Sequence, residues 1–378
     1  MAIEPTEPLD APALRRRFDD AGGLTVGVEE ETMLLAPGSD DLAPVAAAVL
    51  ERLAGDARFK PELPAAQLEI STAPAASAGA AAAQLAAARR DLAAAADGLA
   101  RPAVAGVHPT AAAEGVLSDG ARYELLRGQY PTIARRQLVA ALQVHVAVGG
   151  AERTLAVHDA LRSYLPELAA LAANAPFHGG RDTGLASIRP TISAQLPRQG
   201  VPPALESWER FAAELRWGAA AGGVPQPRMW WWELRPHPAF GTLELRVPDA
   251  QTTVAEGAGV IAFAQALVAT LADRFDAGEP LPVAPTWRIE ENRWAALRDG
   301  LDATFADLGT AEPVPARERL AALIDAVAPA AARLGASAEL EQARLLLREG
   351  GGAARQRAAA ERRGVAGVAG WLAERFLA

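Results

Sequence analysis

The sequence predicts an α+β fold, in which an antiparallel sheet is followed by a mainly helical region. Short segments with alternating apolar and polar residues occur through the first two-thirds of the chain. Helical stretches of unequal length separate them, without the regular repeat of a βαβ fold. From about residue 249 nearly every segment has a helical pattern. Together these observations favour one sheet with helices packed against it.

The elements follow from local pattern. Alternation with β-branched residues predicts strands, and runs rich in alanine and leucine predict helices. The expected strands are Leu24–Leu35, Gln67–Thr72, Ala103–Gly106, Leu138–Val148, Trp230–Arg235 and Thr242–Val247. The expected helices are Ala75–Ala100, Glu152–Ala173 and Pro203–Ala220, with a loop or short helix over 110–130 and a helical tail interrupted near Gly278–Pro285.

The chain is long enough for one large domain. Residues 1–22 are expected to form a loosely held arm, and residues 23–378 a single catalytic domain that is helical from about residue 251. We find no internal repeat and no Gly/Ser-rich linker that would separate two domains. Apolar stripes in the helical tail, near residues 320–377, could pair two subunits as a homodimer.

Composition excludes several classes of function. The formal net charge of −9 argues against a nucleic-acid binder, which needs a basic face. The chain has no cysteine and therefore no thiolate nucleophile or disulfide framework. Lys60 is its only lysine, and no P-loop motif occurs. The N-terminal region lacks the apolar core of a signal peptide, and we expect a cytoplasmic protein without a membrane span.

Strand alternation places polar residues of several strands on one face of the sheet, because residues two apart in a strand share a face. The apolar partners of each strand, such as Val26 and Val28, then face the core. The polar set is rich in glutamate and comprises Glu29, Glu31, Gln67, Glu69, Gln143, His145, Glu233, Arg235, Glu244 and Arg246.

Half-exposed strands ordinarily carry polar residues on a solvent face, and that is the simplest interpretation of any single strand here. Two features favour a functional site. Glutamate is a poor strand former, yet it recurs, and lysine is absent from these strands. Clustered carboxylates also repel one another unless a cation lies among them. Mg²⁺ or Mn²⁺ suits such an oxygen-rich site with one imidazole.

Arginine beside carboxylates and metal indicates phosphoryl transfer, in which positioning and charge neutralisation supply most of the catalysis. Arg235 and Arg246 would clamp a phosphate or carboxylate with two hydrogen bonds each. For each arginine taken alone, a structural salt bridge is an equally good interpretation. The tryptophans at 230–232 could stack on adenine, although packing is the commoner role of such residues, and Trp294, Leu297, Leu301 and Phe305 fit the core face of a helix over 287–308.

At these residues the sequence resembles the carboxylate-amine ligases of the glutamate–cysteine ligase type 2 family. The matching motifs span most of the chain in the family's order. They are VGVEEE (Val26–Glu31), ELxxxQLEIST (Glu62–Thr72), QVHVAVG (Gln143–Gly149), NAPFHGGRDTGLASIRP (Asn174–Pro190), WWELRPHPAFGTLELRVPDAQT (Trp231–Thr252) and ENRWAALRDGLDA (Glu291–Ala303).

The resemblance implies a glutamine-synthetase-like fold, with a curved antiparallel sheet that has helices on its outer side and cradles ATP and Mg²⁺. It also implies a reaction in which ATP phosphorylates a substrate carboxylate, commonly the γ-carboxylate of glutamate, and an amine attacks the acyl phosphate. By motif the metal ligands would be Glu29, Glu31, Glu69 and Glu244, joined by Glu62, His145 and Gln143. Arg246, Arg235 and Arg189 would act in catalysis, and Arg246, Arg181, Asn292 and Arg293 would contact nucleotide or substrate.

Three positions depart from the family's pattern. Gln143 replaces a histidine, so that a carbonyl oxygen is offered in place of an imidazole, while His178 and Asp299 stand where aromatic residues are common. These changes would fall near the substrate pocket. Two other functions remain open on the same fold: phosphate transfer to a guanidino nitrogen, and ATP binding without catalysis.

Overall fold

The computed structural model describes residues 9–221 and 229–378. Its centre is a seven-stranded antiparallel sheet with the strand order β2-β3-β1-β5-β9-β8, in which β4 also pairs with β1. The strands are β1 (Val26–Leu35), β2 (Phe59–Pro61), β3 (Gln67–Ser71), β4 (Arg101–Ala103), β5 (Leu142–Ala147), β8 (Leu234–His237) and β9 (Thr242–Leu245). The predicted α+β class is confirmed.

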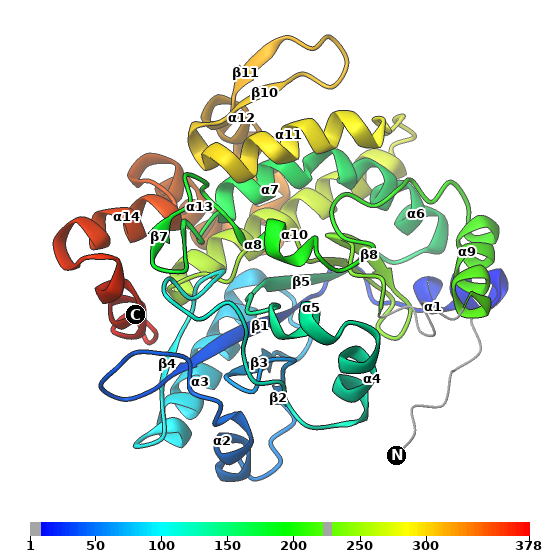
Figure 1. The fold of residues 1–378 in the computed structure, drawn as a ribbon. Coiled ribbons are helices and arrows are strands. Elements are labelled where there is room, and N and C mark those ends of the chain that lie inside the picture. Colours follow the sequence, from blue (N-terminus) through cyan, green and yellow to red (C-terminus); the bar gives the residue numbers. More distant parts are fainter. Residues whose placement is uncertain (1–8, 222–228) are drawn as a thin grey trace.

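Helices lie around this sheet (Figure 1). They are α1 (Ala11–Asp19), α2 (Ala46–Arg52), α3 (Ala78–Ala96), α4 (Ala121–Gln129), α5 (Pro131–Arg135), α6 (Ala151–Leu161), α7 (Leu165–Ala172), α8 (Arg189–Ser193), α9 (Trp208–Ala220), α10 (Val254–Asp276), α11 (Thr286–Asp299), α12 (Ala316–Arg333), α13 (Ser337–Glu349), α14 (Gly352–Arg363) and α15 (Val368–Ala373). Two small hairpins complete the fold: β6 (Phe177–His178) with β7 (Arg181–Asp182), and β10 (Thr304–Ala306) with β11 (Pro313–Pro315).

The apolar face of the sheet packs on α10 and α3. Val26, Val28 and Val144 are fully or almost fully buried in the core cluster that contains α10, and Leu68 and Ile70 lie in the cluster with α3. A capping box starts α10: Thr253 accepts from the Glu256 backbone N–H, while the Glu256 side chain accepts from the Thr253 N–H. This helix is long and apolar enough to cross a membrane, but 83% of its most apolar window is buried within the protein, as expected of a core helix.

Several elements differ from expectation. The arm predicted over residues 1–22 contains α1 in its described part, and α1 is fixed because Phe18 is fully buried and stacks on Trp208 with ring centroids 4.7 Å apart. Residues 1–8 lie outside the described range. The single helix expected over 152–173 is broken by the 3₁₀ turn Arg162–Tyr164, after which Pro166 lies in the first turn of α7, where its missing N–H costs nothing.

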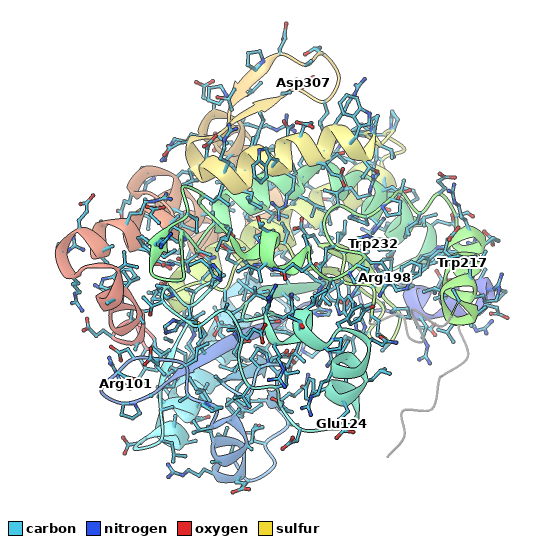
Figure 2. All side chains as sticks on the ribbon, viewed as in Figure 1. Arg101, Glu124, Arg198, Trp217, Trp232 and Asp307 are labelled. Atoms are coloured by element: carbon cyan, nitrogen blue, oxygen red, sulfur yellow. The ribbon has the colours of Figure 1, made fainter. Side chains whose placement is uncertain are left out.

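The C-terminal region is helical as predicted, except for the β10–β11 hairpin, which projects at the top of the molecule where Asp307 lies (Figures 1 and 2). Helix α11 therefore ends at Asp299, and Phe305 is buried from a strand and not from a helix. Trp294 is half exposed, so its predicted core position is wrong. Aromatic packing explains the tryptophan run in part, since the Trp230 and Trp232 rings meet edge to face at 4.9 Å.

Candidate active site

The strand register brings the polar set together on one face, as the alternation predicts. Glu31 lies opposite Glu69 across β1 and β3, Glu29 opposite Gln143 across β1 and β5, and His145 opposite Glu244 across β5 and β9. Neighbouring residues in these pairs are close enough for their side chains to interact directly. We call the face that carries them the acidic face.

Glu29, His145 and Glu244 form the part of the acidic face best suited to a metal ion. Each offers a ligand atom, and these atoms lie within 4.8 Å of one another. His145 Nδ1 is 3.0 Å from the Thr242 hydroxyl, which orients the ring, and Nε2 lies 3.7 Å from a Glu29 carboxylate oxygen. Nε2 is buried, and no group in the described part of the chain makes a hydrogen bond to it. A ring nitrogen held in this way is free to ligate a cation.

Glu31 and Glu244 are tied together by a hydrogen-bonded chain. The Ala141 N–H donates to Glu31 at 2.7 Å, and the Gln143 amide donates to its other oxygen at 2.9 Å. Arg246 in turn donates to the Gln143 carbonyl oxygen and to Glu244. The oxygen that Gln143 was expected to offer to a metal is therefore occupied by Arg246, and Gln143 acts here as a bridge.

The sequence suggests that Arg235 clamps a phosphate or carboxylate ligand, but in the structure Arg235 pairs with Glu244. Its guanidinium makes two hydrogen bonds to Glu244, at 2.6 and 3.0 Å, and a third to the Trp230 carbonyl at 2.7 Å. Arg235 is buried, and the planar fork of donors is used to hold this carboxylate. It is a positioning residue for Glu244.

Glu62 and Glu69 extend the acidic face toward the edge of the sheet. Glu69 accepts from the Lys60 ammonium at 3.0 Å and from the Ser71 hydroxyl at 2.9 Å. Glu62 precedes the strand and accepts from the adjacent Leu63 N–H at 3.1 Å. Lys60 was not predicted as a site residue; its one signal in the sequence is that no other lysine occurs.

The pKa values of these carboxyl groups diverge. Burial, with the charges of Glu31 and Glu69, raises the pKa of Glu62 to about 8. Burial also raises the pKa of Glu31. Burial opposes ionisation of Glu244 too, but Arg235 and Arg246 outweigh it and hold its pKa well below the usual range. Glu244 is therefore held as a carboxylate, whereas Glu62 and Glu31 resist ionisation, and a bound cation would stabilise their charged forms.

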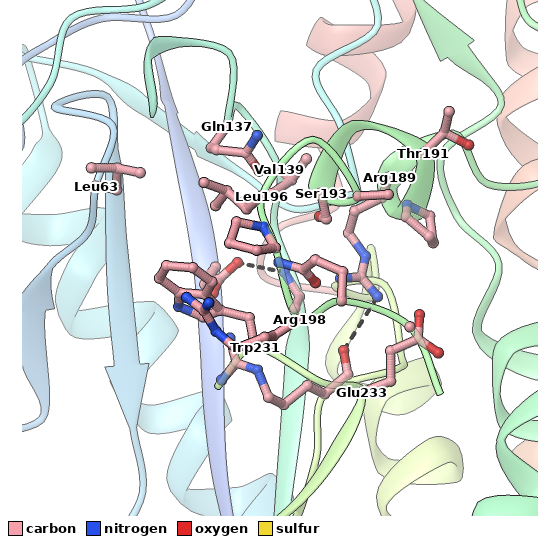
Figure 3. Close-up of a pocket in the computed structure, with 18 of the residues that line it drawn as sticks. Leu63, Gln137, Val139, Arg189, Thr191, Ser193, Leu196, Arg198, Trp231 and Glu233 are labelled. Carbon is pink, nitrogen blue, oxygen red and sulfur yellow. Dashed lines mark hydrogen bonds between the residues drawn. The ribbon is translucent and has the colours of Figure 1, made fainter. Parts of the chain in front are cut away.

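A cavity of about 690 Å³ opens beside Glu31 and Glu62 (Figure 3). Three predicted arginines line it, and each is fixed in place. Arg189 donates to Asp249 at 2.7 Å and to the Val247 carbonyl, Arg293 pairs with Glu233, and Arg246 holds Glu244. Apolar and aromatic side chains are interspersed with these polar groups in the lining, namely Leu63, Tyr123, Leu126, Val139, Leu196, Trp231, Trp294 and Leu297. Trp231 has the Arg198 guanidinium 5.4 Å from its ring centroid.

Two residues predicted to contact nucleotide or substrate lie away from this cavity. So do two of the positions at which the sequence differs from the family's pattern. Arg181 is exposed on the β6–β7 hairpin. Asn292 uses both side-chain atoms on the backbone of Ala306, at 2.7 and 2.8 Å, which anchors the β10 hairpin. Among the described residues, His178 and Asp299 do not line the cavity either, so the departures expected near the pocket lie elsewhere.

An antiparallel sheet that presents carboxylates and fixed arginines to one cavity is the arrangement of an ATP-dependent carboxylate-amine ligase. Residues 25–368 match the family model described as "Glutamate-cysteine ligase family 2(GCS2)". The chain belongs to this family, which confirms the predicted resemblance and C–N ligase class.

Two relatives agree with this assignment, and one solved structure has a similar fold. The chain is 38% identical over 369 residues to "Putative glutamate--cysteine ligase 2-3" of Rubrobacter xylanophilus, covering 96% of this chain and 99% of that protein. It is 37% identical over 355 residues to "Putative glutamate--cysteine ligase 2-1" of Frankia alni, covering 91% and 92%. The fold is similar to that of glutamate–cysteine ligase from Francisella tularensis in complex with AMP, with a TM-score of 0.64 and 12% identity over 94% of this chain and 89% of that one.

Proposed function

We propose that the chain joins the γ-carboxylate of glutamate to an amine in an ATP- and magnesium-dependent reaction that passes through an acyl phosphate. The observation that carries the proposal is the acidic face, where Glu29, Glu31, Glu62, Glu69 and Glu244 meet beside a cavity lined by arginines. The family assignment supplies the reaction class, and the AMP bound by the Francisella tularensis enzyme supports a nucleotide as co-substrate.

The residues present fit a divalent cation. Within residues 9–221 and 229–378, the buried His145 Nε2 has no hydrogen-bond partner, and it lies close to carboxylate oxygens of Glu29 and Glu244. These three side chains would hold one ion. Glu31, Glu62 and Glu69 would hold a second, because Glu31 and Glu69 lie opposite each other in register, and the charges of both raise the pKa of Glu62. Among the described residues Glu62 has no cationic hydrogen-bond partner. Mg²⁺, or Mn²⁺ in its place, would neutralise charge on the phosphates when bound.

The arginines beside this face would position the anionic substrates. Arg246 lies between Glu244 and Gln143 and lines the cavity, so it is placed to contact the transferred phosphoryl group. Arg189 and Arg293 border the same space and would contact a substrate carboxylate or phosphate. Because each is already held by a carboxylate partner, little side-chain entropy is lost when a ligand binds.

The chemistry follows from the weakness of a carboxylate as an electrophile. A γ-carboxylate oxygen of glutamate attacks the terminal phosphorus of ATP, an O–P bond forms, and the bond to ADP breaks. The amine nitrogen then attacks the acyl carbon, and inorganic phosphate leaves with its C–O bond electrons. The nitrogen loses a proton in that step, for which an acidic-face carboxylate is the available acceptor.

Cysteine is the first amine to test, because glutamate–cysteine ligation names the family. A cytoplasmic location, where ATP and free amino acids are available, belongs to the same proposal. So does a homodimer formed through the C-terminal helices.

The direct test is turnover of ATP by the purified chain with glutamate, Mg²⁺ and a panel of amino acids and amines. ADP formation that requires both glutamate and one amine, with the amide product identified by mass spectrometry, is the expected result. ADP formation with a phosphorylated guanidino compound would show phosphotransfer in its place. ATP binding without turnover on any substrate pair would contradict the ligase proposal.

A further inference from the structure

Lys60 lies among the carboxylates that are proposed to hold metal. It is on the edge strand β2, where the register places it opposite Glu69. Its ammonium is 3.0 Å from a Glu69 carboxylate oxygen, 2.8 Å from the Ser71 hydroxyl and 3.9 Å from a Glu29 carboxylate oxygen. A single monovalent cation thus contacts two of the proposed ligands, from two neighbouring strands.

The choice of lysine is informative because every other cationic side chain of the 37 Lys and Arg residues is an arginine. Where this protein fixes a carboxylate permanently it uses the planar guanidinium, as Arg235 does on Glu244 with two hydrogen bonds. An ammonium is a compact charge on a flexible stem, without the fork that locks such a pair. The Lys60 side chain is also 47% exposed, against 10% for Arg235, so solvent lies within its reach.

We propose that Lys60 is a displaceable cation that occupies the acidic face in the metal-free protein and moves toward solvent when a divalent ion binds. In the metal-free state it offsets the repulsion between Glu69 and Glu29 and keeps their oxygen atoms directed at one point. Lys60 is therefore a positioning residue, and it lowers metal affinity by competition. The inference rests on the proposed metal site.

Because Lys60 is the only lysine, NMR can observe its side chain without overlap from other lysines. Protein labelled with ¹³C-lysine contains one lysine spin system, whose side-chain signals can be followed during titration with Mg²⁺ in the presence of ADP. Isothermal calorimetry under the same conditions gives the metal dissociation constant. We expect the ε-CH₂ signal to shift and narrow toward the values of an exposed, mobile side chain, with the same midpoint as the calorimetric titration.

Three variants test whether Lys60 competes with Mg²⁺ directly or affects Mg²⁺ affinity only through the net charge of the protein. Lys60→Met removes the competing cation and should tighten Mg²⁺ binding about three- to tenfold, the size expected for one screened charge close to a divalent ion. Lys60→Arg keeps the charge in a fork that clamps Glu69, and should weaken binding about threefold or more. Arg58→Met is the matched control: it removes the same charge two residues away, from a side chain that pairs with Asp56 and Asp91, and should leave the dissociation constant within about twofold.

The outcomes distinguish this inference from the proposed function. If Mg²⁺ binds and the lysine signal stays unchanged at saturation, Lys60 is a fixed ion pair and the inference is overturned. The same conclusion follows if Lys60→Met binds Mg²⁺ no more tightly than Arg58→Met. If neither calorimetry nor the lysine signal detects Mg²⁺, with ADP present, the metal site itself is absent, and the proposed function fails with it.

Discussion

The two faces of β1 hold neighbouring carboxylates in opposite ways. Glu30 points into the core, where it is fully buried and paired through two hydrogen bonds, at 2.6 and 2.8 Å, with the equally buried Arg89. Arg89 also donates to the backbone carbonyls of Gln251, Thr252 and Phe376. Glu29 and Glu31, one residue to either side, share their face with other carboxylates.

The difference separates a structural carboxylate from a functional one. On the core face the chain supplies a permanent guanidinium that uses all its donors within the protein, so no ligand is needed. On the acidic face the compensation is partial. It includes the half-exposed Lys60 ammonium, a His145 nitrogen without a hydrogen-bond partner among the described residues, and a Glu62 carboxyl whose pKa is raised to about 8. Burial alone does not distinguish the two roles, because both sets are largely buried.

Replacing Glu30 with glutamine is expected to have the largest effect on stability. Arg89 would remain buried without a counter-charge, and removing one partner of a buried ion pair typically costs about 3–5 kcal/mol. We expect that loss in the free energy of unfolding, measured with denaturant, and ligase activity per folded molecule close to wild type. A loss below about 1 kcal/mol would mean that solvent reaches this pair.

Glu29→Gln is the matched change on the other face. It removes a proposed metal ligand, so ligase activity should fall at least about 100-fold. His145 and Lys60 lower the pKa of Glu29 in the folded protein, so the free energy of unfolding of the metal-free protein should also fall, but by less than about 1 kcal/mol because both contacts are long. Steady-state kinetics and denaturation of the same preparation test both halves. Full activity in this variant would remove Glu29 from the site.

A buried histidine on helix α6, His158, predicts that the free energy of unfolding decreases at acidic pH. Burial lowers the pKa of His158 from 6.5. Its Nδ1 is 2.9 Å from Asp159, and its buried Nε2 has no hydrogen-bond partner among the residues that the structure describes. The unfolded state therefore binds the proton more readily, and stability that is complete above about pH 6.5 is lost as the pH falls below it. One such group contributes at most about 1.4 kcal/mol per pH unit.

Thermal unfolding between pH 7.5 and 5 measures this effect. His158→Asn keeps an amide able to donate to Asp159 but removes the titration, so its melting temperature should fall less than that of the wild type over this range. Parallel curves for the two proteins would assign the acid sensitivity to other groups.

Much of the acidic face could be predicted from the sequence because strand alternation is local. That Glu29, Glu31, Glu69 and Glu244 share one face of the sheet follows from the alternation of residues along each strand, and the register agrees with it. What alternation does not give is the partner of each side chain. Arg235 pairs with Glu244, and Arg246 donates to the Gln143 oxygen. These contacts depend on which strands are neighbours and on the length of the side chains that cross between them.

The missed features have similar physical causes. The role of α1 depends on a distant contact, since Phe18 becomes buried only when Trp208 packs against it. The hairpin after α11 follows Gly300, whose φ of +58° suits a glycine and lets the chain turn out of the helix. The motif predicts a nucleotide or substrate contact for Asn292, yet both its amide nitrogen and its amide oxygen bond the Ala306 backbone.

The smallest expected effect concerns Arg181, which the family motif placed near nucleotide or substrate. The structure puts it on an exposed hairpin, where its neighbour Asp182 pairs with Arg357 at 2.8 Å. Arg181→Ala should therefore change the KM for ATP and for glutamate by less than about twofold, and stability by less than about 0.5 kcal/mol. Arg246→Lys provides the contrast: the charge stays but the fork between Glu244 and Gln143 is lost, and the KM for ATP or kcat should change at least about tenfold. A large effect at Arg181 would show that the β6–β7 hairpin closes over the substrates during turnover, so that the working site extends beyond the acidic face.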